Sequence, residues 1–420
     1  MKMLNLTAGA LIAATGFSSA AFAQTTLTMW YHGAGNKVES ALINQIIDDF
    51  NASQSDWKVE LESFPQNSYN DSVTAAALAG NLPDILDMDG PIMPNWAWSG
   101  YLQPLPIDAA QFKDFLPGTK GIYDGKLYSI GLWDAAVALY ARKSTMEELG
   151  LRTPTLDKPW SKDEFMAAMK AAKESGKFDA AIDLGMSDKG EWYPYAFLPF
   201  LQSFGGDLID RTDYQSADGV LNGDAALAWG DWWQSMFKNG YAPGTSEDPA
   251  DHENGFIDGK YAFSWNGNWN AVKTMAKVED VEFLPAPDFG NGSTIGGGSW
   301  QFGISAASKH ADGAADFIKF ATQDKYLAAF SDAIGLIPAT KSAAQMTENY
   351  KEGGPLAVFF GLSQAQAKKR PVTPGYVVES KVFQKAAADI ADGADVADTL
   401  DAAVDQIDAD IKRNDGYKTH

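Results

Sequence analysis

The sequence predicts an α/β protein with two lobes, in which helices flank β-sheets. The chain has 420 residues, 45% of them hydrophobic and 21% charged, so it can bury more than one hydrophobic core. Its N-terminal part alternates strand-like and helix-like segments, which is typical of a sheet covered by helices. A second helical region begins after residue 150 and indicates a second folding unit.

The N-terminal segments follow the order strand, helix, strand, helix, strand. The first strand is predicted over residues 27–30. A helix follows it, because apolar residues recur at every fourth position: Val38, Leu42, Ile46 and Phe50. The next strand, helix and strand are expected over residues 59–62, 68–78 and 83–88. Strands separated by helices at this spacing favour a parallel sheet with right-handed crossovers.

The loops after two of these strands are candidates for the rim of a binding site. Ligands of parallel sheets sit beyond the carboxyl ends of the strands, which here are residues 30–35 and 87–90. These loops carry side chains suited to ligand contact: Tyr31, His32, Asp87 and Asp89. We therefore expect these four residues to bind the ligand from one lobe.

The second helical region opens with a clear helix start. Ser161, followed three residues later by Glu164, predicts a capping box ahead of an amphipathic segment. At the C-terminus, apolar residues at helical spacing predict a closing amphipathic helix: Val396, Leu400, Val404, Ile407 and Ile411.

Residues 1–23 are predicted to be a secretory signal peptide. Lys2 precedes an apolar stretch, and Ala21-Phe22-Ala23 forms a small-residue cleavage site. The stretch is interrupted by polar residues and falls short of the ~20 residues that a membrane span needs. Because the chain has no cysteine for a lipid anchor, a bacterial periplasm is the expected compartment.

Composition disfavours several kinds of partner and site. The formal charge, 33 − 55 = −22, repels nucleic acid, so none is expected as a partner. Without cysteine the chain has no disulfide or thiolate site, and its four histidines form no HxxxH or HExxH pair, so no metal is expected. No glycine-rich phosphate loop or GxSxG turn occurs, and no cofactor is expected.

The aromatic content points to a sugar as ligand. The chain has 13 tryptophans, many of them beside Gly, Asn or Asp instead of in aliphatic runs. A flat indole can cover the apolar face of a sugar while neighbouring amides and carboxylates bind its hydroxyls. Paired carboxylates for glycoside hydrolysis remain possible, because the chain offers 55 acidic residues.

Several sequence blocks resemble a known family in their order and spacing. They are residues 80–84 (GNLPD), 125–130 (GKLYSI), 160–165, 204–207 (FGGD), 256–262 (FIDGKYA), 266–269 (NGNW) and 297–305. With these blocks the chain resembles the extracellular solute-binding proteins of ABC sugar importers, the maltose-binding-like family. The resemblance implies a type II periplasmic binding protein fold, with mixed sheets and a ligand cleft between the lobes.

The resemblance also implies where the lobes begin and end. The N-terminal lobe is expected to comprise residues 24–130 and 287–337, and the C-terminal lobe residues 131–286 and 338–420. Further ligand-binding residues follow by position in the family's pattern: Asp134, Trp192, Tyr193, Trp269, Gly297, Gly298, Ser299, Trp300 and Arg370.

The implied function is that of a periplasmic receptor for a disaccharide, a short oligosaccharide or a polyol. The receptor is expected to be a monomer that closes on its ligand and delivers it to the permease subunits of an ABC transporter in the inner membrane. Two alternatives remain open at this point. One is a secreted carbohydrate-active enzyme, a glycosidase or lyase, and the other is a receptor for an anionic solute such as a sugar phosphate, bound through Arg370.

Overall fold

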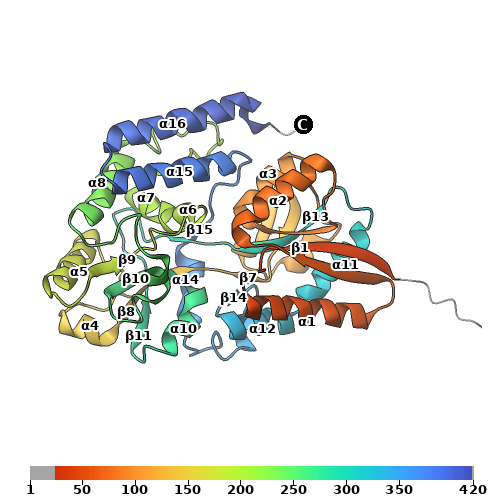
Figure 1. Ribbon diagram of the computed structural model, residues 1–420, viewed down its shortest axis with the longest axis horizontal. Helices are drawn as coiled ribbons and strands as arrows, with labels where there is room; N and C mark the ends of the chain where they lie inside the picture. The colour runs from red at the N-terminus through yellow and green to blue at the C-terminus, as the bar shows by residue number, and fades with distance from the viewer. Residues whose placement is uncertain (1–23, 419–420) are drawn as a thin grey trace, which may run out of the picture.

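A computed structural model describes residues 24–418, which form two halves, each built around its own sheet (Figure 1). We call the half with the seven-stranded sheet the first half and the half with the four-stranded sheet the second half. The predicted signal peptide, residues 1–23, lies outside the described residues. Within residues 24–418, no helix is both long and apolar enough to cross a membrane.

The first half contains a mixed seven-stranded sheet with the order β2-β1-β3-β13-β6-β5, in which β4 also pairs with β13. Strand β1 is parallel to β2 and β3, as the sequence predicts, whereas β13 is antiparallel to β3, β4 and β6. The strands are β1 (Thr25–Tyr31), β2 (Trp57–Ser63), β3 (Ile85–Asp89), β4 (Leu102–Gln103), β5 (Lys120–Tyr123), β6 (Lys126–Ile130) and β13 (Trp300–Ser305). The central strand β13 therefore comes from a part of the chain far from its neighbours.

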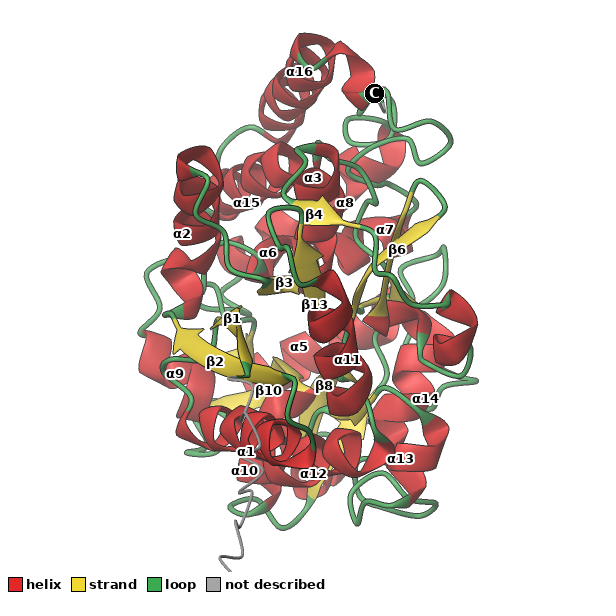
Figure 2. Cartoon of the chain, turned by 90° about the vertical axis from the view of Figure 1, so that its right-hand side faces the viewer, coloured by secondary structure: helices red, strands yellow, loops and turns green. Residues whose placement is uncertain are grey.

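Helices cover both faces of this sheet, which Figure 2 shows between a lower and an upper helical layer. They are α1 (Lys37–Ser53), α2 (Gln66–Ala79), α3 (Met93–Trp98), α11 (Ala311–Ala321) and α12 (Asp324–Ile334). Helix α1 begins where Asn36 accepts a hydrogen bond from the Glu39 amide, and it buries Ile46 and Phe50 as predicted. Val38, in the first turn of α1, is 49% exposed and does not join the buried face.

The second half contains the sheet β11-β8-β10-β9, with strands β8 (Val137–Arg142), β9 (Ala180–Asp183), β10 (Tyr261–Gly267) and β11 (Val281–Leu284). Its larger helices are α5 (Lys162–Glu174), α8 (Asp224–Lys238), α14 (Ala357–Gln366), α15 (Tyr376–Ala391) and α16 (Val396–Arg413). Its shorter helices are α4 (Lys143–Glu148), α6 (Trp192–Ala196), α7 (Leu198–Phe204), α9 (Pro249–Asn254) and α10 (Ala271–Met275). The capping box of Ser161 and Glu164 and the closing helix are confirmed.

Short strands mark where the chain passes between the halves. Strand β7 (Trp133–Asp134) pairs with β14 (Ile337–Pro338), and β12 (Ile295–Gly296) pairs with β15 (Ala367–Lys368). Helix α13 (Lys341–Gln345) follows β14 and contacts α12. The remaining 3₁₀ helices are Gly90–Ile92, Ala109–Phe112, Pro117–Thr119, Asn268–Asn270 and Asp415–Tyr417.

The segment before β13 packs with the second half. Phe289, which the sequence-based boundaries place in the first lobe, stacks on Phe204 at 4.9 Å and contacts Trp232 at 4.5 Å between ring centroids. The chain then returns to the first half through the glycines that precede Trp300. The apolar Phe289 ring thus packs into the core of the second half.

A further contact joins the halves near the C-terminus. The Asn95 side-chain amide in α3 donates to the Pro374 carbonyl at 2.9 Å. The Trp98 indole donates to the Lys418 carbonyl at 3.0 Å, and its ring meets Tyr417 edge-on at 5.0 Å. In Figure 1 these contacts lie at the upper side of the molecule, away from β7 and β14. The halves are thus also held together away from the strands where the chain passes between them.

Candidate functional site

One wall of the candidate site is formed at the ends of β1, β3 and β13. His32 directly follows β1, Asp87 lies in β3, and Trp300 begins β13. The strand pairing therefore brings all three residues to the same end of the strands. The Trp300 and His32 rings stack with centroids 3.5 Å apart and an interplanar angle of 6°. Asp89 lies directly opposite Trp300 in the β3–β13 register. We call His32, Asp87, Asp89 and Trp300 the first wall.

A buried hydrogen bond holds the histidine of the first wall. His32 Nδ1 bonds with Asp87 Oδ2, and both side chains are buried. Burial acts to lower the pKa of His32, but the charge and hydrogen bond of Asp87 outweigh it and raise this pKa. Burial raises the pKa of Asp87 against the opposing effect of His32. The pair fixes the imidazole plane on which Trp300 lies.

The opposite wall is aromatic and belongs to the second half. Trp269 lies in the 3₁₀ turn after β10 and is 37% exposed. A Cβ atom on Gly267 would lie 2.1 Å from the indole, so the ring rests directly on the glycine backbone. Trp192 meets Trp269 edge-on at 6.0 Å, and Tyr195 is tilted against it at 5.9 Å. We call Trp192, Tyr195 and Trp269 the second wall.

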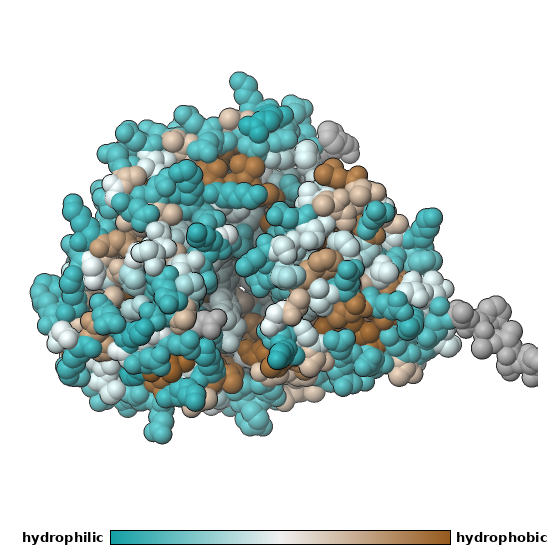
Figure 3. Space-filling model, viewed as in Figure 1, coloured by the Kyte–Doolittle hydropathy of each residue, from teal (hydrophilic) through white to brown (hydrophobic). Residues whose placement is uncertain are grey.

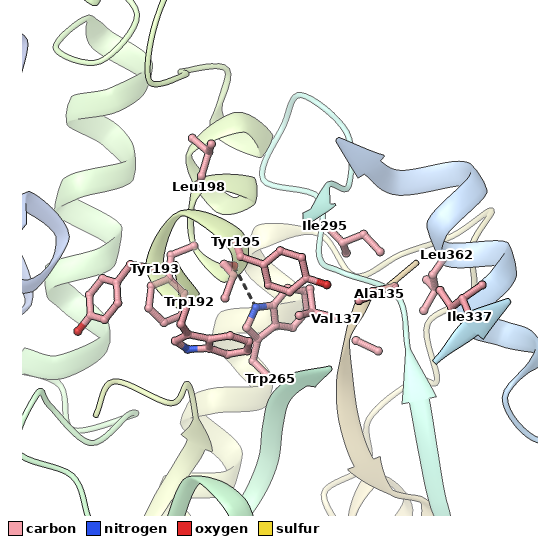
Figure 4. Packing of buried hydrophobic residues seen from close by; sticks show 14 of the residues in the cluster. Ala135, Val137, Trp192, Tyr193, Tyr195, Leu198, Trp265, Ile295, Ile337 and Leu362 are labelled. Carbon is pink, nitrogen blue, oxygen red and sulfur yellow. Dashed lines mark hydrogen bonds between the residues drawn. The ribbon is translucent and has the colours of Figure 1, made fainter. Parts of the chain in front are cut away.

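Helix α6 presents the residues of the second wall. Figure 4 shows Trp192 and Tyr195 close to Trp265, whereas Tyr193 points the other way. The Trp192 indole donates to the Leu184 carbonyl at 3.1 Å, and the Trp265 indole donates to the Ala196 carbonyl at 3.0 Å. These hydrogen bonds hold the helix and the rings that face the first half.

Arg370 connects the two walls. Its guanidinium lies 5.1 Å above the Tyr195 ring centroid and pairs with Asp89 of the first half through Nη1 at 3.2 Å and Nη2 at 3.3 Å. The same guanidinium pairs with Glu191, which also accepts a hydrogen bond from the Tyr376 hydroxyl. Burial raises the pKa of Glu191, although the Arg370 charge opposes this effect. Arg370 is therefore the centre of an ion-pair network that spans both halves.

Asp134 holds the polypeptide where it passes between the halves. Its Oδ1 accepts from the Ala135 amide at 2.9 Å and the Gly298 amide at 2.8 Å, and its Oδ2 accepts from the Ser363 hydroxyl at 3.0 Å. Burial raises the pKa of Asp134 despite these three hydrogen bonds. Gly298 has φ +96°, a conformation that favours glycine. Asp134 thus positions the loop that leads into Trp300.

Several buried polar atoms have no hydrogen-bond partner among residues 24–418. They include the Tyr195 hydroxyl, Arg370 Nε, Gln366 Oε1 and Asp87 Oδ1. The Tyr195 and Arg370 atoms lie at the junction of the walls, where a buried polar group left unpaired costs about 1–3 kcal/mol. A ligand with several hydroxyl groups can pair with such atoms, because a hydroxyl both donates and accepts.

The predicted site residues fall into groups with different surroundings. The structure brings together His32, Asp87, Asp89, Trp300 and Arg370, with Trp192 and Trp269 on the facing wall. Gly297 and Ser299 are buried in the connecting loop, where the Ser299 carbonyl accepts from the Gly90 amide at 3.1 Å. Figure 3 shows that the surface is hollowed between the two halves.

Two predicted residues have side chains that are engaged elsewhere. Tyr31 is fully buried, and its hydroxyl donates to Glu39 behind His32. The Tyr193 hydroxyl donates to the Met186 carbonyl at 3.0 Å, and the ring lines a separate surface pocket of about 410 Å³. A second surface pocket, of about 770 Å³, lies beside β11. Both pockets lie apart from the residues of the two walls.

Sequence reasoning did not identify three residues of the junction, Glu191, Tyr195 and Tyr376. Glu191 and Tyr195 belong to the segment Glu-Trp-Tyr-Pro-Tyr, whose mixture of acidic and aromatic residues was a usable signal. No comparable pattern surrounds Tyr376, which reaches the site only because α15 begins there. In the part of the chain that the structure describes, no group of three His, Asp or Glu residues is arranged to hold a metal ion.

Comparison with known proteins gives matches over most of the chain. Residues 45–357 match the family described as bacterial extracellular solute-binding protein. The multiple sugar-binding protein of Streptococcus mutans is 24% identical over 373 residues, which cover 82% of this chain and 83% of that protein. The mannitol-binding protein of Pseudomonas aeruginosa is 28% identical over 279 residues, which cover 62% of each.

The fold also matches solved structures. The GacH receptor of Streptomyces glaucescens, determined unliganded and in complex with acarbose, superposes with a TM-score of 0.78 at 22% sequence identity. The superposition covers 94% of this chain and 100% of the receptor. The predicted α/β fold of the maltose-binding-like type, with mixed sheets and flanking helices, is confirmed.

Proposed function

The chain belongs to the bacterial extracellular solute-binding protein family, and we propose that it captures a carbohydrate for an ABC importer. The proposed ligand is a disaccharide, a short oligosaccharide or a polyol. The names of the Streptococcus mutans and Pseudomonas aeruginosa relatives, a sugar-binding and a mannitol-binding protein, support this ligand class. Because the family consists of solute-binding proteins, the chain is not an enzyme, and the glycosidase or lyase alternative no longer applies.

The observation that carries the proposal is the pairing of aromatic rings with unpartnered polar atoms at the junction of the halves. Trp300 and Trp269 offer indole surfaces from opposite halves, and the Tyr195 hydroxyl and Arg370 Nε at the junction have no hydrogen-bond partner among residues 24–418. A sugar has apolar C–H faces and a rim of hydroxyls, so it can use both kinds of group at once. A purely apolar ligand would leave the polar atoms unsatisfied.

The proposed mechanism is closure of the two halves around the ligand. The lobes correspond to the two halves, with the return to the first lobe at Gly297 instead of residue 287. Only the closed form makes ligand contacts from both walls, so the ligand shifts the open–closed equilibrium by its differential affinity for the closed form. The chain segments at β7 and β14 are the proposed hinge.

We further propose that the chain is exported to the periplasm, cleaved after Ala23, and acts there as a monomer. The closed receptor would then present both lobes to the permease subunits in the inner membrane. N-terminal sequencing of the exported protein tests the cleavage site, since a mature chain that begins at Gln24 is expected.

A thermal-shift screen followed by calorimetry tests the ligand class. The protein would be screened with maltose, mannitol and diacetylchitobiose, because a ligand held only by the native state raises the apparent stability by mass action. At least one of these is expected to raise the melting temperature and to be recovered unchanged. Failure of all neutral sugars and polyols in a broad panel would contradict the proposal.

A further inference from the structure

The charged groups at the junction indicate which carbohydrates the site accepts. We propose that Asp89 and Glu191 are specificity-determining residues that occupy Arg370 and so make the site select uncharged sugars or polyols over phosphorylated or acidic ones. This inference rests on the proposed function and narrows its ligand class.

Protein carboxylates already occupy the face of the Arg370 guanidinium that carries both terminal nitrogens. Its two terminal nitrogens pair with Asp89, and Nη1 also pairs with Glu191. The Tyr195 ring lies below it, and only 4% of the arginine side chain is exposed. An arginine can recognise phosphate or carboxylate with its two terminal nitrogens or with Nε and Nη2, and here protein carboxylates already fill the first of these donor pairs.

The charge of the network leads to the same conclusion. With both carboxylates ionised, the group of Arg370, Asp89 and Glu191 carries one net negative charge. Because burial raises the pKa of Glu191, this residue can also retain its proton, and the sum is then zero. The nearby Lys369 ammonium donates to the Lys120 carbonyl at 3.2 Å and lies in the field of the buried Asp134. Neither state of the network offers the net positive charge that a buried anion requires.

Neutral hydroxyls, by contrast, fit the atoms that remain. Arg370 Nε is a buried donor that has no partner in the described part of the chain, and the Tyr195 hydroxyl can donate or accept. Sugar hydroxyls can bond to these atoms without displacing either carboxylate. A phosphate would either break the Asp89 or Glu191 pair or bind at Nε and Nη2 beside two carboxylates whose charge already balances or exceeds that of the guanidinium, and either is costly in a buried site.

The test compares matched neutral and anionic probes on the full mature chain. Calorimetry would measure the affinities of mannitol and mannitol 1-phosphate, and of maltose and maltose 6′-phosphate, for the wild type and three variants. The wild type is expected to prefer the neutral member by about tenfold or more. Asp89→Asn should shift this preference toward the phosphate by about tenfold, because it frees the guanidinium. Asp89→Asn combined with Arg370→Gln should lose that gain.

A matched control separates local from global charge effects. Asp405→Asn removes one carboxylate from the exposed face of α16 and should leave the preference unchanged. Melting temperatures show whether each variant is folded, and Glu191→Gln provides a second route to the same shift if Asp89→Asn does not fold. A wild type that binds the phosphates as well as the neutral probes would overturn the inference and leave the proposed function standing. Absence of binding by every probe and by every member of the broad neutral panel would overturn both.

Discussion

The two walls of the site hold their tryptophans in different ways. On the first wall, Trp300 lies flat on His32, and the hydrogen bond to buried Asp87 fixes the imidazole. On the second wall, Trp269 touches Trp192 and Tyr195 only through edge and tilted contacts and keeps 37% of its surface exposed. Trp300 is therefore expected to contribute to the stability of its half, whereas Trp269 is expected to contribute mainly to ligand affinity.

The halves also differ in how they treat a buried carboxyl group. Asp87 in the first half is paired with His32. Glu379 in α15 of the second half is also buried, but both of its carboxyl oxygens lack a hydrogen-bond partner among the described residues. The Asp87 carboxyl group orients the His32 ring. The Glu379 carboxyl group instead lowers the stability of the native state by an amount that depends on pH.

The largest effect is expected from Trp300→Ala. Removing a half-buried indole that stacks on His32 should lower the free energy of unfolding by about 2–3 kcal/mol, and it should also weaken sugar binding. Chemical denaturation and calorimetry measure the two effects. Trp57→Ala is the matched control, since Trp57 begins β2 at the opposite end of the same sheet and its loss should spare binding. Unchanged stability in Trp300→Ala would remove the distinction between the walls.

Trp269→Ala should act on affinity alone. We expect binding to weaken by about tenfold or more, which corresponds to about 1.4 kcal/mol, because the ligand loses its stacking surface on the second wall. The melting temperature should change little, since the ring is partly exposed and lies at the edge of its half. Calorimetric titration with the best ligand from the screen measures the effect. Unaltered affinity would show that Trp269 lies outside the site.

Glu379→Gln should raise the free energy of unfolding relative to the wild type, and this gain should grow as the pH rises. Burial raises the pKa of Glu379 to about 8 from its ordinary value of 4.5. Below about pH 4.5 both states of the wild type are protonated. Between about pH 4.5 and pH 8 the Glu379 carboxyl group ionises only in the unfolded state. The free energy of unfolding of the wild type therefore falls as the pH rises through this range. The amide variant lacks this loss and should gain on the order of 1–2 kcal/mol at pH 6.5 relative to pH 5.

Denaturant titrations of wild type and Glu379→Gln at both pH values measure this difference. The control is Glu60→Gln, which removes an exposed carboxylate on β2 that pairs with Lys58 at the surface. It should show no comparable dependence on pH. A Glu379→Gln variant equally destabilised at both pH values would mean that the carboxyl group is paired in solution.

The smallest effect is expected from Ser161→Ala. The substitution removes one side of the capping box at the start of α5 and should cost about 1 kcal/mol of stability. Ligand affinity should stay at the wild-type value, because α5 contributes no residue to either wall. Chemical denaturation measures the stability and calorimetry measures the ligand affinity. Ser161→Thr should retain most of the stability, because its hydroxyl can still accept a hydrogen bond from the Glu164 amide.

The sequence predicted well what depends on local pattern. The first strands and helices, the Ser161 cap and the C-terminal helix α16 follow from periodicity and capping residues, and the structure has them. The insertion of β13 between β3 and β6 did not follow from such patterns, because the local sequence of a strand does not show which distant strand it pairs with. The same holds for Phe289, whose place in the second half is decided by its packing.

The candidate site was predicted by residue type more than by geometry. The glycine-rich surroundings of Trp269 and Trp300 indicated surface turns, and these two rings are partly exposed. Other tryptophans, such as Trp229, Trp233 and Trp265, are buried in the core, so tryptophan content alone overstated the site. The occupation of Arg370 by Asp89 and Glu191 could not be seen in advance, since the three residues are far apart in sequence.

The central position of β13 affects the order in which the first half can fold during synthesis. Strands β3 and β6 remain without their shared neighbour until about three quarters of the polypeptide has been synthesised. Pairing over such sequence separations closes slowly, because the entropy of a long loop must be overcome first. The nascent chain therefore spends its early life without a finished N-terminal sheet, a state suited to threading through a translocation pore.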